Sequence, residues 1–183
     1  MKKYPIILLF FILPVFSESL KDRRSDEFFT HTGDVLQYVL PVSAGAYSLA
    51  IRDKEGLRSF VYTLGSTYIL TYSLKYSVAR PRPFHEPDSR GDSFPSGHTS
   101  SAFSGAAYLQ RRYGGKPGIP AYLLACAAGY SRVWSGWHHW TDVIAGAAIG
   151  TGFAYLFTEP YEKVQVSAGA NSTGGSLSVS VKF

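Results

Sequence analysis

Five apolar segments rich in small residues dominate the chain after its first 34 residues, and they limit the folds open to it. The segments cover residues 35–51, 59–74, 96–110, 119–131 and 143–158. Their lengths suit helices, and small side chains let helices pack closely. The longest, 17 residues, would rise about 26 Å as a helix, against about 30 Å of bilayer hydrocarbon. The pattern predicts an all-α, single-domain bundle of about six helices, and length alone leaves membrane and water equally open.

The N-terminus has the features of an export signal. Lys2 and Lys3 precede an apolar stretch from Ile6 to Phe16, and small and polar residues follow. A stretch of 11 residues is short for a transmembrane helix, which needs about 20. Residues 1–17 are therefore expected to be a cleaved signal peptide or an uncleaved anchor, and the chain is expected to be exported in either case.

Composition and loop charge favour a membrane location over a soluble one. Only 17% of residues are charged, against about 25% in typical soluble domains. The net charge of +5 is spread along the chain without a basic run, which argues against a nucleic-acid partner. If every segment crosses, the basic loops 52–58 and 111–118 fall on the side of the N-terminus, the cytoplasmic side. The bundle is thus expected to span a bacterial cytoplasmic (inner) membrane, with 75–98 and 132–138 on the periplasmic face.

The end of the chain differs from the rest. Residues 164–170 and 177–183 alternate apolar and small polar residues around a turn sequence. We divide the chain into the N-terminal segment 1–17, a helical domain at 18–160 and a tail at 161–183. The tail is expected to be a short β-hairpin or disordered.

Polar residues collect at three places, and the first follows the second apolar segment. Pro81 and Pro83 must end a helix there and hold Arg82 in a rigid extended stretch, while Lys75 points from the last helical turns. These residues are candidates for binding an anion. The alternative is an ordinary basic flank.

The second place is a predicted helix start at Pro95-Ser96-Gly97-His98. The first amides of a helix have no partner within it, and with the helix dipole they favour an anion. Gly97 allows close backbone approach, and His98 would lie beside the bound anion. Taken alone, this stretch is more often a helix cap than a site.

The third place runs from Arg132 to Asp142. His138 and Asp142 are four residues apart, so on a helix they would share a face. The carboxylate would then accept the Nδ1–H of the imidazole and leave Nε2 free as a nucleophile. A purely structural ion pair is the alternative.

Together the three places read Lys-x6-Arg-Pro at 75–83, Pro-Ser-Gly-His at 95–98 and Ser-Arg-x5-His-x3-Asp at 131–142. This resembles the type 2 phosphatidic acid phosphatase (PAP2) superfamily over approximately residues 35–158. The resemblance implies a PAP2/haloperoxidase-like helical fold. It also selects Arg82 over Arg80 as the phosphate-binding arginine and implies no metal or other cofactor.

The resemblance also assigns roles. Substrate phosphate would be bound by Lys75, Arg82, Ser96, Gly97 and Arg132. His138 would attack phosphorus to give a phosphohistidine, Asp142 would orient it, and His98 would protonate the leaving oxygen and then activate water.

His139 and the tryptophans lie near this third place. His139 would point about 100° away from His138 and is expected to be a bystander. Trp134, Trp137 and Trp140 are expected at a membrane interface.

The leading hypothesis is a lipid-phosphate phosphatase on the outer face of the membrane. Undecaprenyl diphosphate or lipid A is favoured, and phosphatidate and phosphatidylglycerophosphate remain open. The alternative is a soluble exported acid phosphatase that uses the same site. Vanadate-dependent haloperoxidase chemistry is a remote third, and the sequence indicates no oligomeric state.

Overall fold

The computed structural model describes residues 27–83, 91–161, 164–171 and 174–181. Its elements are α2 (Glu27–Ala50), α3 (Lys54–Val78), α4 (Gly97–Tyr113), α5 (Gly115–Trp134), α6 (Trp140–Phe157), β1 (Val164–Asn171) and β2 (Gly174–Val181). Within these ranges the helical bundle is as predicted, with five helices where the sequence suggested about six for the whole chain. The segment 1–17, assigned to a signal peptide or anchor, lies outside the described residues.

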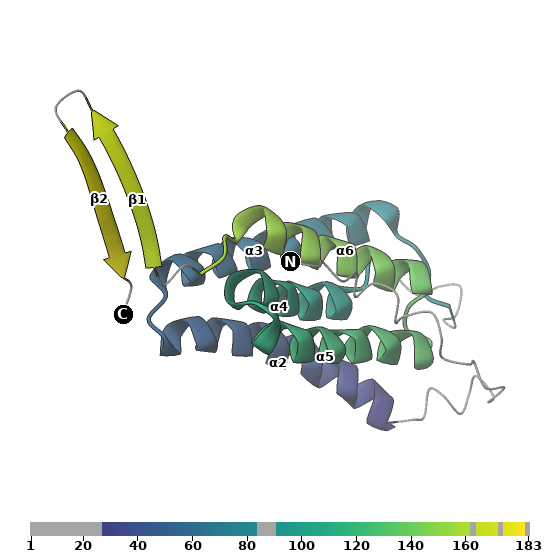
Figure 1. Cartoon of the computed structure of the whole chain (residues 1–183). Helices are drawn as coiled ribbons and strands as arrows, with labels where there is room; N and C mark the ends of the chain where they lie inside the picture. The colour runs from purple at the N-terminus through teal and green to yellow at the C-terminus, as the bar shows by residue number, and fades with distance from the viewer. Residues whose placement is uncertain (1–26, 84–90, 162–163, 172–173, 182–183) are drawn as a thin grey trace.

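Helix α4 is the centre of the bundle and contacts each of the other four described helices (Figure 1). It is buried over nearly its whole length because alanine, serine and glycine fill it. Its core residues Ala102, Ala106 and Ala107 are completely buried. Small side chains at the centre let the surrounding helices approach closely.

Helices α4 and α6 pack closely against each other, and two glycines of α6 permit this. A Cβ at Gly146 would lie 2.6 Å from the carbonyl oxygen of Ser96. A Cβ at Gly150 would lie 2.4 Å from the carbonyl oxygen of Ser100. The glycines thus bring the start of α6 against the start of α4, where two of the predicted motifs lie.

Successive helices alternate in direction, so the three motifs meet at one end of the bundle (Figure 1). Helix α3 ends at Val78, because Ala79 adopts a left-handed conformation with φ 46° and Pro81 cannot continue the helix. Helix α4 begins after Ser96, whose side chain accepts from the Thr99 amide. The turns at residues 52–53 and 114 lie at the opposite end of the bundle.

That opposite end contains a buried ion pair that the loop-charge argument did not foresee. Arg112 donates from Nε and Nη2 to the two carboxylate oxygens of Asp53, both at 2.7 Å. Both side chains are at most 5% exposed. The sequence places Arg112 in the basic loop 111–118, on the predicted cytoplasmic side. In the structure it lies in the last turn of α4, and it contacts both Asp53 and the chain after α6.

The tail forms a two-stranded antiparallel hairpin that extends away from the bundle, one of the two outcomes that the sequence left open (Figure 1). Its register runs from Val164 opposite Val181 to Asn171 opposite Gly174. In the described part of the chain, no helix combines the length and the apolarity needed to cross a bilayer. The expected membrane-spanning bundle is therefore not confirmed.

Candidate active site

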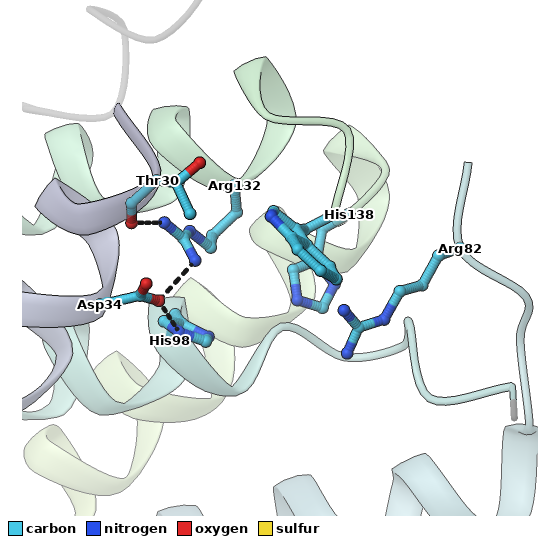
Figure 2. A pocket seen from close by; sticks show the side chains of 7 residues that line it. Thr30, Asp34, Arg82, His98, Arg132 and His138 are labelled. Carbon is cyan, nitrogen blue, oxygen red and sulfur yellow. Dashed lines mark hydrogen bonds and ion pairs between the residues drawn. The ribbon is translucent and has the colours of Figure 1, made fainter. Parts of the chain in front are cut away.

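A pocket of about 210 Å³ opens at the end of the bundle where the motifs meet (Figure 2). Its lining residues are Thr30, Asp34, Arg82, His98, Arg132, Trp137 and His138. Four of the eight predicted site residues are in this lining: Arg82, His98, Arg132 and His138. The other four lie around the lining and contact either a lining residue or a residue that holds one in place. They are Lys75, Ser96, Gly97 and Asp142.

His138 precedes α6 rather than lying on it, because His139 is the N-cap residue and the helix begins at Trp140. The prediction that His138 and Asp142 share a helix face is therefore wrong. His138 Nδ1 lies 2.7 Å from the carbonyl oxygen of Ser93 and 3.9 Å from Asp142 Oδ2. A carbonyl only accepts, so Nδ1 carries the proton. His138 therefore has the expected tautomer, with the proton on Nδ1. The backbone carbonyl of Ser93 fixes this tautomer, and the Asp142 carboxylate does not.

Asp142 is fully buried beneath the histidine and holds several donors. Its Oδ1 accepts from Arg80 Nη1 at 2.7 Å, and its Oδ2 accepts from the Ser93 hydroxyl at 2.6 Å and the His139 amide at 2.8 Å. Burial by itself would raise the pKa of this carboxyl, but nearby His138 and these donors hold it well below its usual range. Asp142 is thus an anion that acts on His138 electrostatically.

Burial lowers the pKa of His138, against the opposing influence of Asp142. Lys75 and Arg82 lower it further. The imidazole is therefore neutral near pH 7, with an unprotonated Nε2 as the only free lone pair on the ring. This is the state that a nitrogen nucleophile needs.

Arg82 forms one wall of the pocket, and Asp92 fixes its position. Its Nε and Nη2 donate to the two oxygens of Asp92 at 2.7 and 2.8 Å, and its guanidinium lies 4.8 Å from the Trp137 ring centroid. Lys75 Nζ donates to the carbonyl oxygen of Asp92. Burial lowers the pKa of Lys75. Arg80 contacts Asp142 rather than the pocket, so the geometry agrees with the choice of Arg82.

Ser96 is a helix cap in this structure. Its Oγ accepts from the Thr99 hydroxyl at 3.0 Å, and its amide donates to the carbonyl oxygen of Asp142 at 2.9 Å. Gly97 opens α4, and a Cβ there would lie 3.7 Å from the Lys75 side chain. Ser96 therefore acts as a helix cap, which is the alternative that the sequence left open. The start of α4 still lies beside Lys75.

Asp34 is a site residue that sequence reasoning missed. It lies on α2, and its Oδ1 contacts His98 Nε2 at 2.9 Å and Arg132 Nη1 at 2.8 Å (Figure 2). The backbone carbonyl of Thr30 also accepts from Arg132. The first apolar segment of the sequence begins at residue 35, whereas α2 begins at Glu27.

Gly33 is a sequence signal for the contact between Asp34 and Arg132. It extends the buried face of α2 toward the start of the helix. A Cβ at Gly33 would lie 2.4 Å from Arg132 Nε, so the glycine lets α5 approach α2 at this point.

Burial and the neighbouring Arg132 lower the pKa of His98 to about 4, although the bond to Asp34 opposes this. His98 is therefore neutral near neutral pH. A bound dianion would favour its protonated form, because opposite charges stabilise each other. Among the described residues, no three His, Cys, Asp or Glu side chains group as a metal site would require.

The sequence matches the family model described as "PAP2 superfamily" over residues 56–164. This range is more than half of the chain and contains all three motifs. The chain belongs to the PAP2 superfamily. The lipid A 4'-phosphatase of Helicobacter pylori is 34% identical over 166 residues, which cover 85% of this chain and 81% of that protein.

Two solved structures have the same fold. The crystal structure of Aquifex aeolicus LpxE gives a TM-score of 0.61 at 26% identity, covering 75% of this chain and 90% of that one. A transmembrane PAP2-type phosphatidylglycerolphosphate phosphatase from Bacillus subtilis gives 0.58 at 27% identity, covering 75% and 80%. The all-helical arrangement is thus that of PAP2 phosphatases.

Proposed function

We propose that this PAP2 protein is a lipid-phosphate phosphatase that works through a phosphohistidine at His138. The observation that carries the proposal is the pocket itself. A buried neutral histidine presents Nε2 to a space bounded by Arg82, Arg132 and a second histidine, His98. Two guanidinium groups suit the non-bridging oxygens of a phosphate, and two histidines suit nucleophile and acid.

The reaction takes two steps. In the first, a bond forms between His138 Nε2 and phosphorus as the bond to the leaving oxygen breaks, and His98 gives that oxygen a proton. In the second, water attacks phosphorus and gives its proton to His98, the P–N bond breaks, and inorganic phosphate leaves. Arg82 and Arg132, with Lys75 close behind, stabilise the charge on the equatorial oxygens during both steps.

Three positive side chains can supply the charge that a metal supplies in other phosphatases, so activity is expected to be metal-independent. Arg82 and Arg132 line the pocket, and Lys75 lies beside Gly97 at the start of α4. Ser96 keeps that helix start in place, with the Gly97 backbone available to the phosphate.

A location in the cytoplasmic membrane, with the active site on the periplasmic face, is part of the proposal. Large apolar side chains are exposed on several helices, including Val42 at 67%, Ile69 at 72% and Leu156 at 68%. Exposing many apolar side chains of this size to water is energetically unfavourable. Lipid is a partner that would cover them. If the proposal is right, the protein stays with the membrane pellet after carbonate extraction, and release by osmotic shock would favour the soluble alternative.

The substrate class that we favour is a lipid A phosphate, with undecaprenyl diphosphate second. The Helicobacter relative is named a lipid A 4'-phosphatase, and its match spans most of both chains. An undecaprenyl-diphosphatase of Bacillus subtilis is 31% identical over a shorter stretch, 49% of each chain. Export and an outer-face site would give access to both lipids.

The deciding experiment measures phosphate release from a panel of lipid and soluble phosphates, with and without EDTA. We expect lipids to be hydrolysed more efficiently than p-nitrophenyl phosphate, with no loss in EDTA. His138→Ala should lower kcat by several orders of magnitude and abolish the labelled phosphoenzyme, whereas His98→Ala should still form it from p-nitrophenyl phosphate. Near-normal turnover by His138→Ala would overturn the mechanism, and chelator sensitivity reversed by magnesium would overturn the metal-independent assignment.

A further inference from the structure

Asp34 places a negative charge inside a pocket whose proposed ligand is itself an anion. Its side chain is 43% exposed and lies between His98 and Arg132. A structural role alone would not require a carboxylate to line the pocket. The position of this charge relative to the reacting atoms has a consequence for the substrate.

In an in-line displacement the leaving oxygen departs on the side of phosphorus opposite the nucleophile. That nucleophile is His138, and the proposed proton donor to the leaving oxygen is His98. Figure 2 shows Asp34 beside His98, across the pocket from His138. The carboxylate of Asp34 is therefore next to the leaving group, whichever lipid is bound.

We infer that Asp34 makes this enzyme selective for phosphomonoesters, whose leaving group is an uncharged hydroxyl, over diphosphates, whose leaving group is a second phosphate. The inference rests on the proposed function and concerns the same site. Asp34 is a positioning and selectivity residue here, because it acts through His98 and through its charge and forms no bond to phosphorus.

A hydroxyl leaving group is compatible with the carboxylate. A protonated His98 has two ring N–H groups, so one can remain with Asp34 while the other serves the leaving oxygen. The departing alcohol of a sugar or glycerol carries no charge and can donate a hydrogen bond to a carboxylate.

A phosphate leaving group is not compatible with it. It carries at least one negative charge as it departs, and like charges within a few ångströms repel strongly where solvent is partly excluded. The positively charged side chains among the described residues do little to offset this negative charge on the Asp34 side of the pocket. Arg132 already pairs with Asp34, and Arg82 pairs with Asp92 on the opposite wall.

The test compares two lipids that differ only in the leaving group, phosphatidate and diacylglycerol diphosphate with the same acyl chains, in mixed micelles. For the wild-type protein we expect kcat/KM to be at least tenfold higher for phosphatidate. Asp34→Asn keeps the shape and an acceptor oxygen but removes the charge. It should raise the diphosphate-to-monoester ratio of kcat/KM at least tenfold.

Two variants control for other effects. Asp34→Glu keeps the charge and should keep the ratio low. Glu27→Gln removes the same charge from an exposed position in the first turn of the same helix and should leave the ratio unchanged. Because the ratio compares two substrates on one protein, a general loss of active enzyme cancels.

If Asp34→Asn is too slow to assay, inorganic phosphate and inorganic diphosphate serve as probes in calorimetry. The variant should then gain at least tenfold in affinity for diphosphate relative to phosphate. A wild-type preference for the diphosphate lipid, or a ratio that Asp34→Asn leaves unchanged in both measurements, would overturn the inference while leaving the proposed phosphatase intact. Wild-type protein that hydrolyses no lipid phosphate at all would overturn the proposed function, and the inference with it.

Discussion

At the scale of single residues, Ser93 joins the two parts of the proposed nucleophile. Its carbonyl oxygen accepts from His138 Nδ1, and its hydroxyl donates to Asp142 Oδ2. The residue is completely buried and lies just before the Pro-Ser-Gly-His motif. Its two contacts have different consequences for mutation, because substitution removes the hydroxyl and keeps the carbonyl.

Ser93→Ala should lower kcat about tenfold with little change in KM. One hydrogen bond to a buried carboxylate contributes about 1.5–3 kcal/mol, and about 1.4 kcal/mol corresponds to a factor of ten in rate. The carbonyl still fixes the tautomer, so the loss should be far smaller than for His138→Ala. Steady-state kinetics measure it, and Ser77→Ala, an exposed α3 position whose hydroxyl bonds its own helix, is the matched control. An effect mainly on KM would contradict this role.

Four of the residues that the motifs single out, Arg82, His98, Arg132 and His138, line the pocket. They could be named from the sequence because each motif is a local pattern with a fixed spacing. The sequence did not predict that the Ser93 carbonyl is the hydrogen-bond partner of His138. A sharp turn at Gly136, with φ 68°, precedes α6, which begins only at Trp140, so His138 lies outside the helix. Asp34 was also missed, and it is 64 residues from its partner His98. Contacts between distant helices depend on packing, and no local spacing encodes them.

At the scale of elements, the crossing of α4 and α6 aligns two motifs. The helix segments were predicted to within a few residues at most ends, since apolar runs and prolines mark them. The exception is the start of α2, where polar residues concealed two helical turns. The sequence showed glycines in α6 but did not distinguish those at the crossing from those facing outward. That distinction depends on which face α4 covers.

Gly150→Ala and Gly152→Ala should therefore have opposite effects on stability. A Cβ at Gly150 would clash with the backbone of α4, and such overpacking costs about 1–3 kcal/mol. A Cβ at Gly152 meets nothing within 4 Å, and alanine is favoured over glycine in a helix by about 0.5–1 kcal/mol. Thermal unfolding followed by circular dichroism compares the two. Equal effects would mean that α6 does not pack on α4 through this face.

At the scale of the whole molecule, α4 carries a polar network at each end and apolar packing between them. Its start contributes His98 to the pocket, and its last turn contributes Arg112 to the ion pair with Asp53. Arg112 also donates to the carbonyl of Glu159 and lies 5.2 Å from the Tyr161 ring centroid. The second network ties the chain after α6 to the bundle at the end opposite the pocket.

Because the pocket holds a partly buried His98 and a buried His138 in neutral form, stability of the whole molecule should fall as pH decreases through the range where histidines titrate. The pKa of His98 is about 4 in the folded state against 6.5 as its ordinary value, and burial lowers the pKa of His138 as well. Below pH 6.5 the unfolded chain binds more protons than the folded one, so the free energy of unfolding decreases toward pH 4. His98 alone should contribute on the order of 3 kcal/mol of this loss.

The measurement is the thermal midpoint between pH 7.5 and 4.5 in a phosphate-free buffer, since bound phosphate would favour protonated His98. Wild-type protein should lose stability throughout this range, before the carboxylates with lowered pKa, Asp53, Asp92 and Asp142, take up protons below about pH 3.8. His98→Gln should flatten the profile, while His31→Gln, an exposed position on α2, should not. Parallel loss in wild type and His98→Gln would assign the acid transition to other groups and remove His98 as a buried neutral base.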